Sequence, residues 1–247
     1  MDLYGLIGFP LEHSFSKDYF NAKFASEKID AEYINFEITA ITELKSIIRD
    51  NPQLKGLNVT IPYKEQVIPY LNRLSDNARS IGAVNVIKID REKKKVKLSG
   101  FNSDIIGFKQ SIEPLLKPHH QRALILGTGG SAKAVSLGLQ QLGRETTYVS
   151  RRKSSEQILT YSELSPKVMA DHTIIVNCTP VGMWPNVDDY PVIPYSLLTD
   201  KHLLYDLLYN PDVTLFMKEG KKYGTFVKNG LEMLLLQAFE GWNIWTK

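Results

Sequence analysis

The sequence predicts an α/β protein with two domains, and three observations lead to this expectation. Strand-like and helix-like stretches alternate along most of the chain, which is typical of a mostly parallel sheet covered by helices on both faces. A glycine-rich turn at 127–132 lies between a strand-like and a helix-like stretch and begins a second series of such units. The length of 247 residues is sufficient for two modest domains.

In the first hundred residues, apolar runs predict the strands and apolar stripes predict the helices. The run at 3–9 ends at Pro10 and predicts a strand followed by a turn. The stretch 16–28 has apolar residues at helical spacing, with Ser16 as a candidate N-cap. The next elements are expected as a strand, a helix, a strand and a pair of strands, at 31–38, 42–49, 57–61, 83–89 and 95–101.

The second half repeats the strand–helix rhythm that a Rossmann-like dinucleotide-binding domain requires. Its strands are predicted at 122–126, 145–150, 173–177 and 202–206. A final apolar helix at 230–245 is expected to fold back onto the first domain. We therefore expect a substrate-binding domain of residues 1–103 completed by the helix 230–247, a dinucleotide-binding domain of residues 104–229, and a cleft between them.

Composition and charge argue against a nucleic-acid-binding protein. Thirty basic and 27 acidic residues give a net charge of +3, which is too small to indicate a nucleic-acid surface. The densest basic stretch lies between two strand-like runs and favours a solvated hairpin over a weak phosphate contact; it contains Arg91, Lys93, Lys94, Lys95 and Lys97. We expect no nucleic-acid partner.

The single cysteine and the absence of long apolar runs indicate the compartment. Cys178 has no second cysteine to pair with, which fits a reducing environment. The N-terminus has no secretory signal pattern, and no apolar run approaches the roughly 20 residues that span a bilayer. We expect a cytoplasmic protein with no membrane partner, as a monomer or a homodimer.

The glycine-rich turn is the first candidate binding site. Small residues between a strand and a helix let the backbone approach a pyrophosphate, and the helix N-terminus presents free N–H groups to it. A tight connection without a ligand is the alternative, but the strand–turn–helix context favours binding. The expected phosphate-binding residues are Gly127, Thr128, Gly129, Gly130 and Ser131, with Ala132 at the position of the usual third glycine.

The residues at the end of the next strand predict which dinucleotide binds. An NAD site usually has a carboxylate there, which accepts hydrogen bonds from the ribose hydroxyls. This chain has Ser150, Arg151, Arg152 and Lys153 instead. Guanidinium groups bind a 2′-phosphate in bidentate fashion, whereas a carboxylate repels it. The spacing therefore favours NADP over NAD, with a solvated basic turn as the alternative.

Six motifs in fixed order resemble those of one enzyme family. They are 8–16 (GFPLEHSFS), 58–64 (NVTIPYK), 82–85 (GAVN), 100–104 (GFNSD), 206–211 (DLLYNP) and 230–237 (GLEMLLLQ). Together they resemble the shikimate dehydrogenases and cover nearly the whole chain. Two departures concern Ser103, where the family commonly has threonine, and the residues after Arg151, which differ from the family pattern for the 2′-phosphate.

The resemblance implies an NADP-dependent oxidoreductase of aromatic amino acid (chorismate) biosynthesis, which reversibly reduces 3-dehydroshikimate to shikimate. It implies that Ser14 and Ser16 bind the substrate carboxylate and that Lys64 and Asp104 form the catalytic pair. The residues that it implies for orienting the ring and its hydroxyls are Thr60, Asn85, Tyr209 and Gln237. Those that it implies beside the nicotinamide and its ribose are Thr179, Leu207 and Gly230.

Elementary chemistry agrees with these roles but leaves simpler alternatives. A lysine donates the proton or stabilises the oxyanion in carbonyl reduction, and Asp104 can orient Lys64. The alternatives are a surface lysine after Pro62, and an N-cap at Asp104 of a helix that starts at Ile105. Ser14 and Ser16 each donate one hydrogen bond to a carboxylate, or simply cap a helix. We expect no metal, since His119 and His120 lack ligand spacing to Cys178.

Three other functions remain open at this point. The first is a broader quinate/shikimate dehydrogenase that accepts NAD, which the basic residues at 151–153 disfavour. The second is a reductase of folate one-carbon groups, for which the serines at 14 and 16 give no support. The third is a non-catalytic NADP sensor, because a fold does not determine function; such a protein has no need of Lys64 and Asp104.

Overall fold

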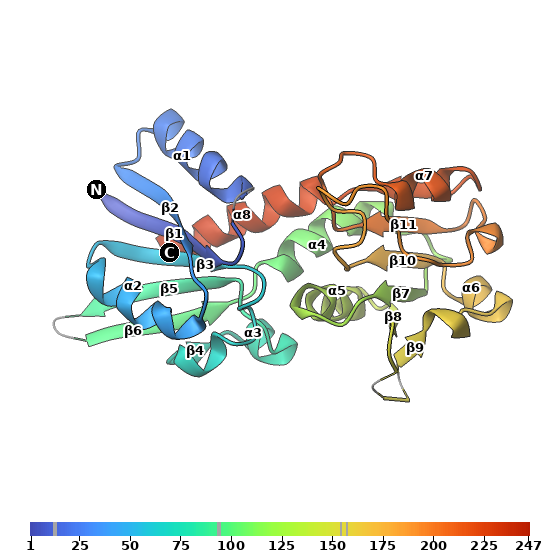
Figure 1. Ribbon diagram of the computed structural model, residues 1–247, viewed down its shortest axis with the longest axis horizontal. Helices are drawn as coiled ribbons and strands as arrows, with labels where there is room; N and C mark the ends of the chain where they lie inside the picture. The colour runs from blue at the N-terminus through green and yellow to red at the C-terminus, as the bar shows by residue number, and fades with distance from the viewer. Residues whose placement is uncertain (12–13, 93–94, 154, 157) are drawn as a thin grey trace. The chain divides into compact units, whose positions relative to one another are not determined.

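The computed structural model describes residues 1–11, 14–92, 95–153, 155–156 and 158–247. The chain forms two compact units, Met1–Ser103 with Ala238–Lys247, and Asp104–Gln237. Each unit contains one six-stranded sheet with helices packed against it (Figure 1). Glu12 and His13 of the motif 8–16, and Lys93 and Lys94 of the basic stretch, lie outside the described residues.

The first sheet has the strand order β2-β1-β3-β5-β6-β4. Its strands are β1 (Asp2–Gly8), β2 (Ala31–Glu37), β3 (Leu54–Val59), β4 (Arg73–Leu74), β5 (Val86–Glu92) and β6 (Lys95–Phe101). β1 is parallel to β2 and β3, and β4 is parallel to β6. β5 is antiparallel to β3 and to β6. The expected parallel sheet is therefore extended by an antiparallel pair. The strand predicted at 95–101 has these bounds, while the one predicted at 83–89 begins and ends three residues later.

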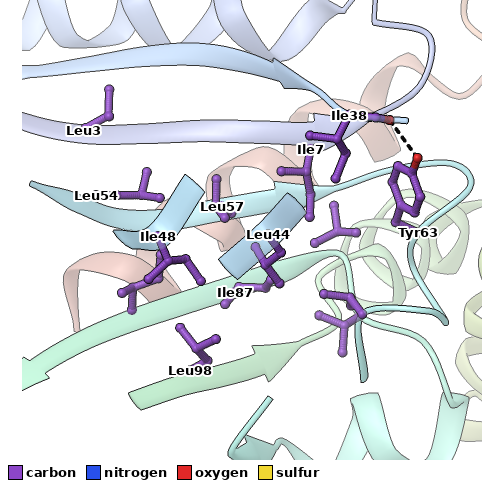
Figure 2. Close-up of a cluster of buried hydrophobic side chains, with 14 of the residues drawn as sticks. Leu3, Ile7, Ile38, Leu44, Ile48, Leu54, Leu57, Tyr63, Ile87 and Leu98 are labelled. Atoms are coloured by element: carbon purple, nitrogen blue, oxygen red, sulfur yellow. Dashed lines mark hydrogen bonds between the residues drawn. The ribbon is translucent and has the colours of Figure 1, made fainter. Parts of the chain in front are cut away.

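The two faces of the first sheet are covered by different helices, because side chains of a strand alternate between faces. These helices are α1 (Phe15–Glu27), α2 (Leu44–Asp50), α3 (Asp76–Ile81) and the end of α8 (Leu231–Thr246). One face packs Ile7, Leu57 and Ile87 against Leu44 of α2, and Figure 2 shows this cluster. The other face packs Tyr33 against Phe20 of α1 and Trp245 of α8.

The start of α1 corrects a sequence prediction. The helix begins at Phe15, so Ser14 occupies the N-cap position and Ser16 lies within the first turn. The side chain of Ser14 makes no capping hydrogen bond. Ser16 is therefore not the N-cap, and neither serine caps the helix through its hydroxyl.

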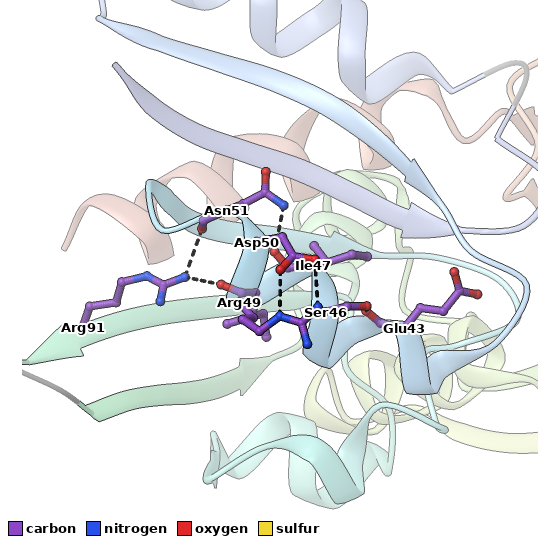
Figure 3. A network of polar contacts seen from close by, with 8 residues as sticks. Glu43, Ser46, Ile47, Arg49, Asp50, Asn51 and Arg91 are labelled. Carbon is purple, nitrogen blue, oxygen red and sulfur yellow. Dashed lines mark hydrogen bonds and ion pairs between the residues drawn. The ribbon is translucent and has the colours of Figure 1, made fainter.

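Arg91 of β5 fastens the C-terminal end of α2 to the sheet (Figure 3). Its guanidinium donates to the carbonyl of Ile48 at 2.8 Å and to that of Asn51 at 3.1 Å. The last carbonyls of a helix have no partner within the helix and carry partial negative charge. The cation of Arg91 satisfies two of the carbonyls at this end.

The second sheet is parallel throughout its described pairings and has the order β12-β11-β10-β7-β8-β9. Its strands are β7 (Arg122–Leu126), β8 (Glu145–Ser150), β9 (Ile158–Thr160), β10 (Ile174–Asn177), β11 (Leu203–Asp206) and β12 (Phe226–Lys228). Counted from β7 as strand 1, the order is 6-5-4-1-2-3, which is that of the dinucleotide-binding fold. The chain reverses its direction of winding between β7 and β10, where such folds bind their ligands.

Helices cover both faces of the second sheet. They are α4 (Asp104–Ile112), α5 (Gly130–Gln141), α6 (Pro166–Asp171) and α7 (Leu215–Lys221), together with the start of α8. α4 and α5 pack on the face that contains Ala123 and Ile125, and α6 and α7 pack on the face that contains Leu124 and Leu126. The alternation along β7 therefore confirms a sheet buried on both sides.

The C-terminal helix and α4 differ from their expected bounds. α8 contributes residues to both units, since Met233 lies in the core of the second unit and Ala238 and Trp245 lie in the core of the first. α4 begins at Asp104, one residue before the predicted start. Among the described residues, no helix combines the length and the apolar character that crossing a membrane requires.

Candidate active site

The glycine-rich turn lies where β7 meets α5, and its backbone has the conformation that the sequence pattern requires. Gly127 has a φ of +106°, which L side chains rarely adopt, and its amide donates to the Val149 carbonyl at 2.8 Å. Gly129 is the N-cap of α5, and a Cβ at this position would have no atom within 4 Å. The N-terminus of α5 has no side-chain cap and no acidic residue in its first turn. This end of α5 is therefore suited to an anion.

Other predicted cofactor residues gather at the same edge of the sheet. A Cβ on Gly127 would lie 3.2 Å from the Thr179 methyl group, so the loop after β10 passes beside the glycine turn. Leu207 directly follows β11, and its carbonyl packs so closely on Gly230 that any Cβ there would clash. The amide of Gly230 donates to the Leu208 carbonyl at 2.9 Å. The structure thus brings Gly127 near Thr179 and Leu207 near Gly230.

The basic residues after β8 differ in how they are paired. Lys153 forms an ion pair with Glu163 at 2.6 Å. This ammonium and the donors of Thr160 hold the pKa of the Glu163 carboxyl at about 2. Arg151 and Arg152 are exposed, and no described residue forms an ion pair with either. Two guanidinium groups therefore remain available to a phosphate at the end of β8.

A buried polar network connects the loops that follow β10 and β11. Asp206 is fully buried and accepts hydrogen bonds from Asn177 Nδ2 at 3.0 Å, from the Leu208 amide at 3.1 Å and from the Thr214 hydroxyl at 2.7 Å. Burial raises the pKa of this carboxyl to about 6. Asp206 begins the motif 206–211, but no role was predicted for Asp206 or Asn177 from the sequence. Each is the polar residue that ends an apolar strand, which is the signal that marks them.

In the first unit, the two predicted carboxylate-binding serines lie at the start of α1. The Oγ of Ser14 is buried and has no hydrogen-bond partner among the described residues. Ser16 forms a side-chain hydrogen bond with the Tyr33 phenol. Burial raises the pKa of this phenol well above its ordinary value, and the Ser16 bond partly opposes the rise. Ser14 is therefore free to donate to a ligand, whereas Ser16 already has a protein partner.

Asn85 is fixed by a chain of hydrogen bonds that sequence reasoning also missed. The Tyr33 hydroxyl donates to Asn58 at 2.7 Å, and Asn58 donates to the Asn85 carbonyl at 3.3 Å. The Asn85 side chain donates to the Ser103 hydroxyl at 3.0 Å and accepts from the Ser103 amide at 2.7 Å. The hydroxyl of Ser103, the family's usual threonine position, therefore helps to hold Asn85 in place.

Thr60 and Lys64 lie after β3, close to the ends of neighbouring strands. The Thr60 amide donates to the Ile7 carbonyl of β1 at 2.9 Å. Lys64 is half-buried, and its carbonyl accepts from the Val84 amide at 2.8 Å, one residue before Asn85. The structure therefore places Thr60, Lys64 and Asn85 in one region of the first unit.

The other predicted substrate and catalytic residues belong to the second unit. Asp104 is 6% exposed and follows directly after the anchored Ser103. Tyr209 is half-buried, and burial raises the pKa of its phenol. Gln237 of α8 donates from Nε2 to the Leu234 carbonyl at 3.0 Å.

Cys178, His119 and His120 were the candidates that the sequence offered for a metal site. Burial raises the pKa of the Cys178 thiol well above its ordinary value, so the group stays neutral. His119 and His120 both contact the Lys201 carbonyl at 3.1 Å, and His120 is buried. The described residues contain no group of three or more His, Cys, Asp or Glu side chains that could hold a metal ion.

The amino-acid sequence of this chain is similar to those of known proteins. The family model of the shikimate dehydrogenase substrate binding domain matches residues 6–87 of this chain. The shikimate dehydrogenase (NADP(+)) of Methanococcus vannielii is 37% identical, and the match covers 99% of this chain and 91% of the relative.

Two solved structures extend the likeness to the whole fold. The shikimate 5-dehydrogenase of Thermus thermophilus, in complex with NADP(H) and shikimate, has a TM-score of 0.84 at 27% identity over 100% of this chain and 94% of that chain. The quinate dehydrogenase of Corynebacterium glutamicum, in complex with NAD, has a TM-score of 0.86 at 25% identity over 99% and 93%. Because the match to the Methanococcus enzyme extends over nearly the full length of both chains, this chain belongs to the NADP-dependent shikimate dehydrogenases, a family of oxidoreductases.

Proposed function

We propose that this chain reversibly reduces 3-dehydroshikimate to shikimate with NADPH, as a step of aromatic amino acid (chorismate) biosynthesis. The observation that carries the proposal is the Ser14 hydroxyl at the start of α1, which is buried and has no hydrogen-bond partner in the described part of the chain. A buried hydroxyl without a hydrogen bond costs free energy, and a ligand carboxylate that accepts from it removes this cost. Shikimate and 3-dehydroshikimate both carry such a carboxylate.

The cofactor proposal is supported by the N-terminus of α5, which has no side-chain cap, and by Arg151 and Arg152, which form no ion pair with any described residue. The pyrophosphate would lie against Gly127, Thr128, Gly129, Gly130 and Ser131. Gly129 has no side chain, and the space that a Cβ would take there is open. The first turn of α5 contains no acidic residue that would repel the phosphates. Arg151 and Arg152, with Ser150, would hold the 2′-phosphate that distinguishes NADP from NAD. NADPH supplies the hydride of the reaction when it is bound.

The proposed roles of the protein residues are binding, orientation and proton transfer. Lys64 would give a proton to the carbonyl oxygen as it becomes a hydroxyl, and would take it back in the reverse direction. Asp104 would orient the ammonium group of Lys64. Ser14 and Ser16 would hold the carboxylate, and Thr60, Asn85, Tyr209 and Gln237 would orient the ring. Thr179, Leu207 and Gly230 would flank the nicotinamide.

A steady-state assay with two cofactors and two substrates tests the proposal. The purified full-length chain is offered NADP or NAD with shikimate or quinate, and NADPH or NADH formation is followed by absorbance. Turnover with NADP and shikimate, at least about tenfold above every other combination, is the expected result. Equal use of NAD or of quinate would instead assign the broader quinate/shikimate activity. NADP binding without any turnover would assign a sensor.

A further inference from the structure

Asp206 and Asn177 end two adjacent parallel strands and are opposite each other in the register of β10 and β11. Neither touches solvent. The loops that follow them contain Thr179 and Leu207, two residues proposed above to flank the nicotinamide. The buried pair therefore lies directly beneath a part of the proposed cofactor site.

Asn177 uses both ends of its amide to fix the loop after β10. Its Oδ1 accepts from the Thr179 amide at 3.1 Å and from the Thr179 hydroxyl at 2.7 Å. Its Nδ2 donates to Asp206 at 3.0 Å and to the Val181 carbonyl at 3.4 Å. Asn177 can hold Thr179 in this way only while its amide is oriented, and Asp206 orients it because a carboxylate accepts from Nδ2 and not from Oδ1.

Asp206 fixes the loop after β11 through its other contacts. The Leu208 amide, next to Leu207, donates to Oδ1 at 3.1 Å. The Thr214 hydroxyl donates to Oδ2 at 2.7 Å, while Thr214 also accepts from the Met217 amide as the N-cap of α7. One carboxyl group therefore connects the two loops and the start of a helix.

We propose that Asp206, acting through Asn177 and the Leu208 amide, is a positioning residue that holds Thr179 and Leu207 in the conformation that binds NADP. A buried carboxylate is costly, and a chain that needed only to fill this space could do so with an apolar residue. The proposal rests on the proposed function, because it assumes that these loops contact the cofactor.

Protonation of Asp206 provides a readout that a merely structural role lacks. Burial, and to a smaller extent the charge of Asp206, raises the pKa of two neighbouring groups, the Cys178 thiol and the Tyr195 phenol. Both groups therefore stay neutral between pH 5 and pH 8. A change in this range in the ratio of the wild-type and Asp206→Asn constants therefore reports Asp206, because groups that both proteins share cancel in it. The protonated form of Asp206 has lost one acceptor site for its three donors.

The experiment measures NADP dissociation constants of the full-length protein from pH 5 to pH 8. Asp206→Asn keeps the shape of the side chain and one acceptor oxygen, and so imitates the protonated form. We expect it to bind NADP several-fold more weakly than the wild type at pH 8 and equally at pH 5. Titration of the cofactor's own phosphate cancels in the ratio of the two constants. Asp206→Ala is expected to bind at least tenfold more weakly across the range.

Hydrogen exchange in the cofactor-free protein gives a second readout that does not depend on binding. Asp206→Ala is expected to speed exchange of the Thr179 and Leu208 amides at least tenfold. Thr214→Val is the milder variant if Asp206→Ala does not fold, and it should show a smaller effect at the same amides.

Tyr205→Phe is the matched control. It removes a buried hydrogen bond to Ser111, 2.7 Å long, from the residue that precedes Asp206 on the same strand. It should lower the melting temperature and leave the NADP dissociation constant unchanged. NADP affinity unchanged in Asp206→Ala, or a ratio of wild type to Asp206→Asn that is constant with pH, would overturn the positioning role. Failure of the wild type to bind NADP would overturn the proposed function instead.

Discussion

Ionisation of Asp206 costs free energy in the folded state, because the carboxyl group is buried. Its three hydrogen bonds lower its pKa, but burial dominates and raises the value from 3.8 to about 6. The folded state therefore holds a proton between pH 4 and pH 6 that the unfolded chain has released. The contribution of this group to stability is fully present below pH 4 and is lost as the pH rises through 6.

This titration predicts how stability varies with pH. Relative to Asp206→Asn, the wild type should lose about 3 kcal/mol of unfolding free energy between pH 4 and pH 7, since each pKa unit corresponds to about 1.4 kcal/mol. Urea denaturation of both proteins at several pH values measures the difference. A difference that stays constant, or that grows in favour of the wild type as the pH rises, would show that the carboxyl is not the buried acid described here.

Lys64 is the residue on which the proposed chemistry depends most. Replacing it with methionine keeps an apolar stem of similar length but removes the proton donor, so we expect kcat to fall about 100- to 10,000-fold. Affinity for NADP should be unchanged. Lys55→Met is the matched control, because Lys55 is an exposed lysine of the same unit, on β3. Full turnover in Lys64→Met would remove Lys64 from the catalytic pair.

At the scale of elements, substitutions in the connection between β7 and α5 distinguish an effect on NADP binding from an effect on stability. Gly129 has a φ of −75° and open space around its missing Cβ, so alanine there should fold normally. The added methyl group would occupy the approach of the pyrophosphate. We expect Gly129→Ala to raise the NADP dissociation constant at least tenfold, with a melting temperature close to that of the wild type.

Gly127→Ala provides the contrast within the same turn. A φ of +106° strains any residue with a Cβ, so this variant should lose about 1 kcal/mol or more of stability as well as affinity. Calorimetric melting and NADP titration of both variants make the comparison. Equal NADP binding by Gly129→Ala and the wild type would mean that the pyrophosphate does not lie on this turn.

The buried strands were predictable from the sequence, while helices with few buried residues and the exact helix starts were not. Strands such as β7 and β10 are continuous apolar runs, which only a sheet buried on both faces requires. α3 has only Ala78 and Ile81 as buried residues, too few to define a stripe. The start of α1 depends on which of two serines, two residues apart, is the cap, and propensity does not separate them.

The polar networks could not be predicted, because their partners are far apart in the chain. Asn177 and Asp206 are 29 residues apart, and Tyr33 and Asn58 are 25 apart. The glycine turn and the basic residues after β8 were predictable because short-range spacing alone defines them. Whether Lys64, Asp104 and the serines act as the resemblance implies stays a prediction.

At the scale of the whole molecule, the structure and the relatives confirm the family and the enzyme class that the motifs indicated. They also confirm the α/β fold, with the strand order of a dinucleotide-binding domain, and NADP as the cofactor of the family. Both ends of the chain contribute to the first unit. Trp245 of α8 is 5% exposed, and its indole N–H donates to the Ile87 carbonyl of β5 at 3.0 Å. Its ring packs on the backbone at Gly56, where any Cβ would clash. Trp245 is therefore part of the core of the first unit.

This packing predicts that Trp245 stabilises a unit in which most of the other residues lie more than a hundred positions earlier. Trp245→Phe should cost about 1 kcal/mol of unfolding free energy through the lost hydrogen bond, and Trp245→Ala about 3–5 kcal/mol through the lost packing. Trp184→Phe is the control, since Trp184 is half exposed. Urea denaturation that found the Trp245 and Trp184 variants equally stable would contradict this role.

Direct hydride transfer between shikimate and NADP is the central claim, and an isotope measurement tests it most directly. The full-length protein is given NADP and shikimate that carries deuterium on the carbon of the reacting hydroxyl, and the NADPH formed is analysed by mass spectrometry. We predict one deuterium in each NADPH formed, with 3-dehydroshikimate as the other product. NADPH without deuterium, or no NADPH from a protein that binds both ligands, would contradict the account.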